Sequence, residues 1–111
     1  MGLSSLFAHW LVTDKVSEFA ERIAARSRQA IWQRVWQKVG TLGQAEARGY
    51  IRARAAAVIQ QETDRLISQE GARAGEIREK LLLVATDVVV KQLLQQSHQT
   101  RKVNAPLRRV A

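Results

Sequence analysis

The sequence contains no cysteine and a single proline, Pro106, in its 111 residues. Without cysteine the chain has no disulfide framework, no thiolate nucleophile and no cysteine-ligated zinc site, so we expect an intracellular protein. Because no glycine- or serine-rich linker precedes the proline, nothing forces a domain boundary before it. We therefore expect one helical domain over residues 1–100, followed by a basic, flexible tail over residues 101–111.

Long apolar runs are also missing. The longest unbroken aliphatic stretches, such as Leu81 to Ala85, are far shorter than the roughly 20 residues that span a bilayer, so we expect no transmembrane helix. The N-terminal stretch MGLSSLFAHWLV has neither the positive region nor the cleavage site of a secretory signal, and the myristoylation pattern fails at Leu6. We expect a cytoplasmic protein, with association with a membrane surface left open.

Residue constellations that carry catalysis or metal binding are absent from the sequence pattern. His9 and His98 lie far apart, and neither has histidine or carboxylate neighbours at metal-ligand spacing. The glycines fit neither a phosphate-binding loop nor a dinucleotide fingerprint. Asp14, Glu18 and Glu21 share a helix face and are interpreted as a solvated acidic stripe. We therefore expect no enzymatic activity, no metal, no cofactor and no small-molecule substrate.

Positive charge is the strongest compositional feature, with a formal net charge of +8. It is clustered, since the stretches 22–45 and 92–111 contain no acidic residue, whereas the signs nearly balance between Glu46 and Lys91. Such clusters suit an anionic surface, and contacts to phosphates would weaken steeply with salt. The candidate anion-binding residues are Arg22, Arg26, Arg28, Arg34, Lys38, Arg101, Lys102, Arg108 and Arg109.

Apolar residues near the N-terminus repeat at the spacing of one helical face, which predicts a short amphipathic helix before Thr13. This wholly apolar face has three interpretations: packing on the rest of the domain, insertion at a membrane surface, or docking on a larger partner. We retain all five of its residues as candidate partner contacts. They are Leu3, Leu6, Phe7, Trp10 and Leu11.

A long second helix is predicted over residues 14–39, with Thr13 as its N-cap and Asp14 in its first turn. Its buried stripe advances mostly in steps of four residues, so the apolar face drifts around the helix and should meet different neighbours along its length. The predicted stripe consists of Val16, Phe19, Ala20, Ile23, Ser27, Ile31, Val35 and Val39.

Trp32 and Trp36 lie one turn apart on this helix and are interleaved with Arg28, Arg34 and Lys38. Both tryptophans border the apolar stripe, which favours burial against another helix or subunit, so we predict that they contact a partner. The alternative is a groove for nucleic acid or lipid, because arginine beside aromatic rings supplies cation–π and phosphate contacts.

Gly40 and Gly43 predict a turn, and Thr41 with Gln44 matches the spacing of a capping box for the next helix. The next helix, from Gln44 to about Glu70, is alanine-rich. Its predicted apolar side consists of Ile51, Ala55, Val58, Ile59, Leu66 and Ile67.

The segment from Gly71 to Gly75 fits either a turn or a helix interior, where each glycine costs about 1 kcal/mol relative to alanine. The sequence leaves this choice open.

The last helix is predicted over about 76–96 and is apolar in nearly every direction of the helical wheel. Its apolar residues are Leu81, Leu82, Leu83, Val84, Ala85, Val88, Val89, Val90, Leu93 and Leu94. A helix that is apolar in nearly every direction lies either at the centre of a bundle or in an oligomer interface. We favour the interface, because so short a chain is not expected to cover this much apolar surface by itself. We predict Leu82, Val89 and Leu93 as partner contacts.

The sequence thus predicts an all-α protein: two or three long amphipathic helices, in a hairpin or bundle, preceded by a short N-terminal amphipathic helix and elongated or oligomeric. The first functional hypothesis is a non-enzymatic interaction or assembly protein that binds a protein partner or its own copies. The alternatives are a nucleic-acid-binding protein that contacts phosphates through residues 22–38 and the tail, and a peripheral protein of anionic membrane surfaces.

Overall fold

The computed structural model describes the backbone of residues 2–110 and the side chains of residues 15–71 and 74–100. Within that part the chain is almost wholly helical and contains no strand, which confirms the predicted all-α class. The helices are α1 (Gly2–Val39), α2 (Gln44–Glu70), the short α3 (Ala72–Glu76) and α4 (Arg78–Val110).

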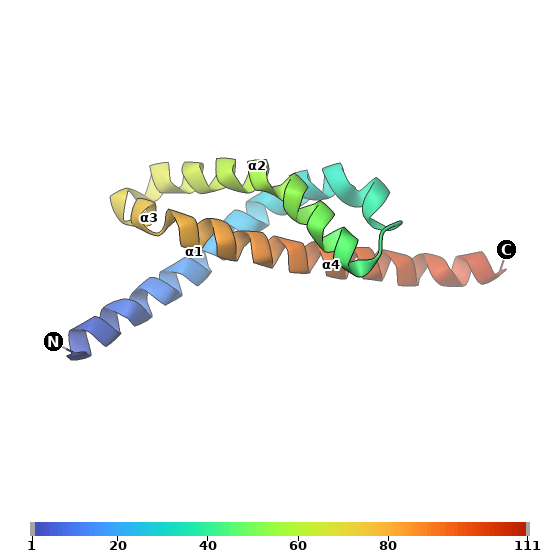
Figure 1. Ribbon diagram of the computed structural model, residues 1–111. Helices are drawn as coiled ribbons and strands as arrows, with labels where there is room; N and C mark the ends of the chain where they lie inside the picture. The colour runs from blue at the N-terminus through green and yellow to red at the C-terminus, as the bar shows by residue number, and fades with distance from the viewer. Residues whose placement is uncertain (1, 111) are drawn as a thin grey trace.

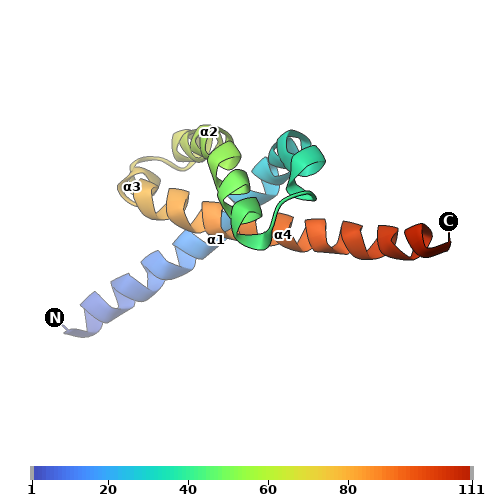
Figure 2. The same cartoon turned by 45° about the vertical axis from the view of Figure 1, so that its right-hand side comes forward.

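The three long helices form a bundle in which α2 runs antiparallel to α1 and α4 (Figure 1). Each long helix contacts the other two. The start of α1 and the end of α4 extend beyond the bundle at opposite ends, as both ribbon views show (Figure 2). The radius of gyration is 17.3 Å, against about 13 Å for a compact domain of similar length. The molecule is therefore elongated, as expected.

α1 buries the predicted apolar stripe in full, from Val16 to Val39. The predicted helix break at Thr13 is wrong, because α1 continues unbroken from Gly2 to Val39. The signal at Thr13 was a capping preference, and a threonine inside a helix costs only about 0.7 kcal/mol or less relative to alanine. No glycine or proline lies between residues 3 and 39 to impose a break.

The turn after α1 lies where Gly40 and Gly43 predicted it, but the predicted capping box is wrong. The hydroxyl of Thr41 donates to the carbonyl oxygen of Lys38 at 2.7 Å. It therefore satisfies an open carbonyl at the end of α1 instead of an amide at the start of α2. The N-cap of α2 is Gly43, and no side chain caps that helix.

α2 buries its predicted apolar side, with Ile67 only partly covered. The helix ends at Gly71, whose φ of 92° and ψ of −166° lie in a region that only glycine adopts readily. The open choice at residues 71–75 is thus decided in favour of a break at Gly71, followed by α3. α4 then begins at Arg78 and extends beyond the predicted end near residue 96 to Val110.

The core is built largely from small side chains, which let the three helices approach closely. It includes five alanines of the long helices with at most 4% of their surface exposed, and the fully buried Ser27 and Thr63. The alanines are Ala20, Ala24, Ala47, Ala55 and Ala85. Larger aliphatic residues such as Ile31, Ile59 and Leu81 fill the space between them.

The expectation that the chain cannot cover its last helix is wrong. Among the described apolar residues of α4, only Leu83 is exposed, at 60%, because α1 and α2 cover the others wholly or in part. Val89 and Leu93 are fully buried, so neither can reach a partner in this arrangement, and Leu82 is half-buried. A helical wheel shows which sides of one helix are apolar, but not which neighbouring helices cover those sides.

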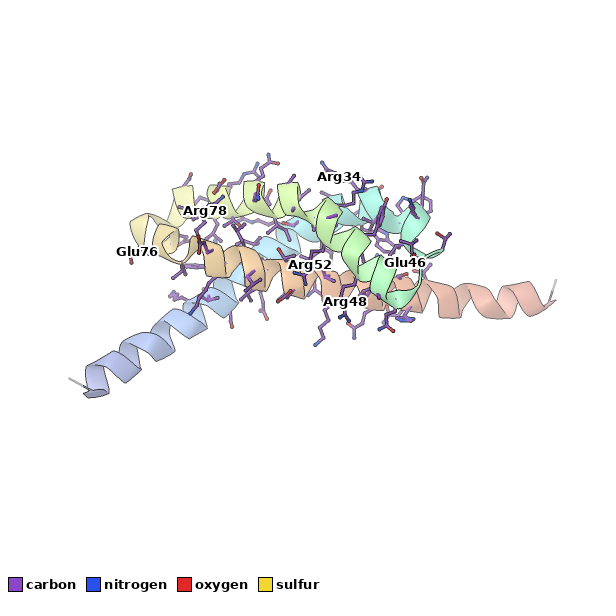
Figure 3. All side chains as sticks on the ribbon, viewed as in Figure 1. Arg34, Glu46, Arg48, Arg52, Glu76 and Arg78 are labelled. Carbon is purple, nitrogen blue, oxygen red and sulfur yellow. The ribbon has the colours of Figure 1, made fainter. Side chains whose placement is uncertain are left out.

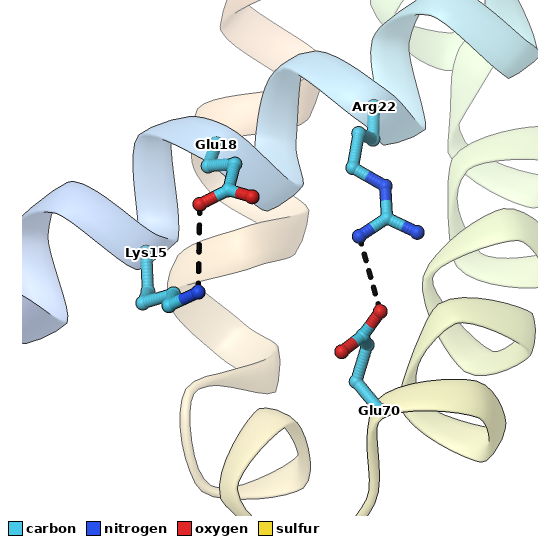
Figure 4. A network of polar contacts seen from close by, with 4 residues as sticks. All are labelled: Lys15, Glu18, Arg22 and Glu70. Carbon is cyan, nitrogen blue, oxygen red and sulfur yellow. Dashed lines mark hydrogen bonds and ion pairs between the residues drawn. The ribbon is translucent and has the colours of Figure 1, made fainter.

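Three ion pairs connect the long helices at the surface: Arg22 with Glu70 at 3.1 Å, Arg52 with Asp87 at 2.7 Å, and Arg78 with Asp64 at 2.9 Å. Figure 4 shows the first of these beside the pair of Lys15 and Glu18 on α1. The hydrogen bond to Asp64, together with the carboxylate charge, raises the pKa of Arg78. All these pairs are solvent-exposed, and exposed ion pairs contribute little to stability.

Candidate anion-binding surface

Positive charge gathers at the end of the bundle that contains the turn between α1 and α2. We call residues 31–59 the basic hairpin. It carries five cations and one acid: Arg34, Lys38, Arg48, Arg52, Arg54 and Glu46. Residues 60–80, toward the opposite end, carry four cations and five acids. Figure 3 shows Arg34 and Arg48 near the turn, and Glu76 at the other end of the bundle.

Four of the five cations in the basic hairpin have no carboxylate partner within the described residues. The exception is Arg52, which pairs with Asp87. The side chains of Arg34, Lys38, Arg48 and Arg54 are exposed. A cation without an internal partner keeps its charge available for an external anion. The hairpin therefore presents several uncompensated charges over a short length of helix.

On the side of α2 that faces α1, two of these cations converge on Tyr50. The Nζ atom of Lys38 lies 5.4 Å from the centre of the tyrosine ring, and the Cζ atom of Arg54 lies 5.2 Å from it. Both distances are within the range of cation–π attraction. The half-buried Tyr50 thus holds two long, flexible cations close together across the boundary between α1 and α2.

On the other side of α2, a groove of about 420 Å³ runs between α2 and α4. Its apolar wall includes Val90 and Leu94, and its rim carries three cations, one carboxylate and one histidine. The lining residues are Gln44, Arg48, Arg52, Asp87, Val90, Lys91, Leu94, Gln95 and His98. Because Asp87 already pairs with Arg52, the groove keeps a positive surplus. Positive side chains therefore flank the first half of α2 on both sides.

The structure divides the predicted anion-binding residues into four groups. Arg34 and Lys38 belong to the basic hairpin, whereas Arg22 pairs with Glu70. Arg26 and Arg28 are exposed on α1, and Arg28 makes a long hydrogen bond of 3.5 Å to Gln92 of α4. The side chains of Arg101, Lys102, Arg108 and Arg109 lie outside the described residues.

Sequence reasoning missed Arg48, Tyr50, Arg52 and Arg54. Their signal was the segment RGYIRAR at positions 48–54, which places four functional side chains within two helical turns. Averaging the charge between Glu46 and Lys91 hid it, because the compensating acids follow only from residue 62 onward. The residues of the groove on α4 were missed because their position depends on how α4 packs on α2.

The predicted apolar contacts have different environments. Trp32 is half-buried against the core, whereas Trp36 remains 49% exposed. The side chains of Leu3, Leu6, Phe7, Trp10 and Leu11 lie outside the described residues. Trp36 on α1 and Leu83 on α4 are the large apolar side chains that the described part of the chain leaves open to solvent.

Among the described residues, no group of three or more histidine, aspartate or glutamate side chains lies close enough to hold a metal ion. No helix in that part is long and apolar enough to cross a membrane. No known protein family, curated protein or solved structure matches the chain. The physical character of its surface is therefore the basis for a functional conclusion.

Proposed function

We propose that the protein binds nucleic acid through the phosphate backbone, without catalysing a reaction. The observation that carries this proposal is the basic hairpin, where four exposed cations have no carboxylate partner among the described side chains. They lie on both sides of α2, so a strand that crosses this helix would meet positive charge on each flank. A polymer with regularly spaced phosphates can use all of these contacts together, and each contact releases counterions.

An anionic membrane is a weaker match to the same surface. Peripheral binding to a membrane normally combines positive charge with several apolar side chains that enter the lipid. No large apolar side chain of α2 is exposed, and the basic hairpin offers Trp36 alone. Charge without an adjoining apolar face favours a fully solvated polyanion over a lipid surface.

Trp36 supports a second candidate, a subunit that assembles with a protein partner. A tryptophan that is half exposed beside a half-buried neighbour, Trp32, is a common hot spot of protein interfaces. The apolar surface of α4 no longer supports this candidate, because the chain itself mostly covers that surface.

The proposal is tested by measuring the affinity for labelled duplex DNA, single-stranded DNA and RNA by fluorescence anisotropy over a range of salt concentrations. If these four cations contact phosphates, the logarithm of the binding constant should fall as the logarithm of the salt concentration rises, with a slope of about −3 or steeper. Vesicles with anionic lipids serve as a parallel probe. Tighter binding to vesicles than to every oligonucleotide would contradict the proposal.

Two variants with the same net charge locate the interface. The first replaces Arg34, Lys38, Arg48 and Arg54 with glutamine. The second, the matched control, replaces four exposed or partly exposed cations toward the opposite end, Lys15, Arg65, Arg78 and Lys80, with glutamine. We expect the first variant to lose about three to four units of salt slope, and the control to lose less than about one. Equal losses would show that overall charge, not the hairpin, determines binding.

A further inference from the structure

α2 begins without a side-chain cap, although helix N-termini usually have one. Its N-cap residue is Gly43, and within the described part no side chain accepts from its first-turn amides. The first backbone hydrogen bond of this turn runs from the amide of Ala47 to the carbonyl oxygen of Gly43, so the amide N–H groups of residues 44–46 have no acceptor within the described part of the chain. Space around Gly43 is open, since an added Cβ would meet nothing within 4 Å. The positive end of the helix dipole is therefore accessible.

A second, independent feature lies beside this helix end. Ser97 of α4 is only 8% exposed, and its hydroxyl has no hydrogen-bond partner among the described residues. Three helical threonines behave differently: Thr63, Thr86 and Thr100 each donate to the carbonyl four residues earlier. Within the described residues, the fully enclosed polar atoms without a partner belong to Ser27 and Glu62, so the unpaired Ser97 oxygen is not sealed in the core and can be reached from the space beside it.

Ser97 lines a small cavity of about 30 Å³ together with the start of α2 and the turn before it. The other lining residues are Val39, Leu42, Gln44, Ala47, Leu94 and His98. No carboxylate lines this cavity, and Glu46, the one acid in the first turn of α2, is exposed and lines neither the cavity nor the groove. The polar side chains that border it are those of Gln44, Ser97 and His98, each of which can donate a hydrogen bond. Gln44 also brings one of the three open amides of α2 to the edge of the cavity, whereas the amide of Ala47 is already bonded to Gly43.

The cavity also opens toward the larger groove between α2 and α4, since Gln44, Leu94 and His98 line both. A volume of 30 Å³ corresponds to roughly two or three water positions, which suits a single charged group of several oxygens. The adjoining groove adds Arg48 and Lys91 on its rim, with Val90 and Leu94 as an apolar wall. The two spaces together suit a ligand with a compact anionic end and a larger body.

We propose that this cavity binds the terminal phosphate of a nucleic-acid strand, whose adjoining nucleotide lies in the α2–α4 groove. The inference rests on the proposed function for the identity of the strand. A terminal phosphate fits better than a phosphate within a strand, because apolar side chains of Val39, Leu42 and Leu94 border the small cavity. A terminal group needs only one exit, and the groove provides it.

The test compares one oligonucleotide in three forms: with a 5′-phosphate, with a 3′-phosphate, and with hydroxyl groups at both ends. We expect one phosphorylated form to bind about tenfold more tightly than the hydroxyl form. In amide NMR spectra, inorganic phosphate alone should shift the signals of residues 44–46. Equal affinity of all three forms would overturn the inference, and so would phosphate shifts confined to other residues.

Three variants separate the cavity from general charge. S97A should remove most of the preference for the phosphorylated form and leave the affinity for the hydroxyl form unchanged. T100A is the matched control, because the Thr100 hydroxyl already has a partner and the residue is exposed. E46Q should strengthen phosphate binding by removing a negative charge from the first turn of α2.

The outcomes for the two proposals are distinguishable. Salt-sensitive binding of all oligonucleotides without any preference for a phosphorylated end would retain the proposed function and overturn the inference that the cavity binds a terminal phosphate. Phosphate shifts at residues 44–46 that disappear in S97A, without binding of any oligonucleotide, would retain an anion site there but overturn both the proposed function and the assignment of a nucleic-acid strand. If S97A keeps the preference for the phosphorylated oligonucleotide, this result would overturn both the role of Ser97 and the binding of the phosphate in the cavity.

Discussion

Lys38 of α1 and Arg54 of α2 converge on one aromatic ring, with their charged groups 5.4 Å and 5.2 Å from the centre of Tyr50. Two cations this close to one ring repel each other, and the negative face of the ring partly offsets that repulsion. No carboxylate of the described residues pairs with either cation. The arrangement keeps both charges available at the boundary between two helices.

This arrangement predicts that the ring of Tyr50, rather than its hydroxyl, supports binding of nucleic acid. Y50A should weaken binding at low salt by about threefold, since an exposed cation–π contact contributes about 0.5–1 kcal/mol. Y50F keeps the ring and should bind like the original protein. Fluorescence anisotropy with one labelled strand measures both variants. A loss in Y50F as large as that in Y50A would assign the effect to the hydroxyl instead.

The buried hydroxyl of Ser27 predicts a stabilising substitution. Ser27 is fully buried in the core, and its Oγ atom has no hydrogen-bond partner among the described residues. An unpaired buried hydroxyl costs roughly 1–3 kcal/mol, so S27A should raise the free energy of unfolding by about 1 kcal/mol after the loss of packing is included. Urea denaturation measures the change.

S68A is the matched control for this substitution, because Ser68 is an exposed residue within α2. The control has the same gain in helix propensity but removes no buried polar group. S27A should therefore exceed S68A in stability. The opposite order would mean that the hydroxyl of Ser27 has a favourable contact in solution.

Two glycines near the second chain reversal should respond in opposite ways to alanine. Gly71 has a φ of 92°, which is strained for any residue with a side chain, so G71A should lower the free energy of unfolding by about 1–3 kcal/mol. A Cβ on Gly75 of α3 would lie 3.7 Å from the Cγ2 atom of Ile67 in α2, an ordinary van der Waals contact. G75A should be neutral or stabilise the protein by up to about 1 kcal/mol. Thermal or urea unfolding of the two variants gives the comparison, and equal effects would argue against the break at Gly71.

Leu81 and Leu83 test whether α4 is covered by its own chain. L81A removes a fully buried side chain and should cost about 2–5 kcal/mol of stability. L83A, on the exposed side of the same helix, should change stability by less than about 0.5 kcal/mol. Sedimentation should give the mass of one chain for the original protein and for L83A. A dimer that dissociates in L83A would restore the assembly hypothesis.

The sequence predicted the helices well where physical periodicity determined them. The stripe from Val16 to Val39 and the apolar side of α2 follow from helical geometry, and both are buried. Capping signals were less informative, because Thr13 and Thr41 are compatible with more than one local structure of similar energy. A hydroxyl near two helix ends can serve either, and the packing of α1 on α2 determines which one it serves.

The candidate site depended on tertiary structure much more than the helices did. Arg34 and Lys38 were predicted because no acid lies near them in the sequence. Arg48 and Arg54 join them only because the turn at residues 40–43 brings α2 back along α1. Ser97 and His98 could not be assigned to the start of α2 without the packing of α4, since about 50 residues separate the two segments.

The alanine-rich core has a consequence for how the protein would respond to heat. Each alanine buries little apolar area, so we expect a modest free energy of unfolding within the usual range of about 5–15 kcal/mol. A ligand that binds only the folded chain adds about 2.7 kcal/mol at a concentration one hundred times its dissociation constant. For a domain of this size, that gain raises the melting temperature by roughly 10 °C or more. Occupancy and thermal tolerance are thus coupled, and heating the purified protein with candidate polymers would rank them by affinity.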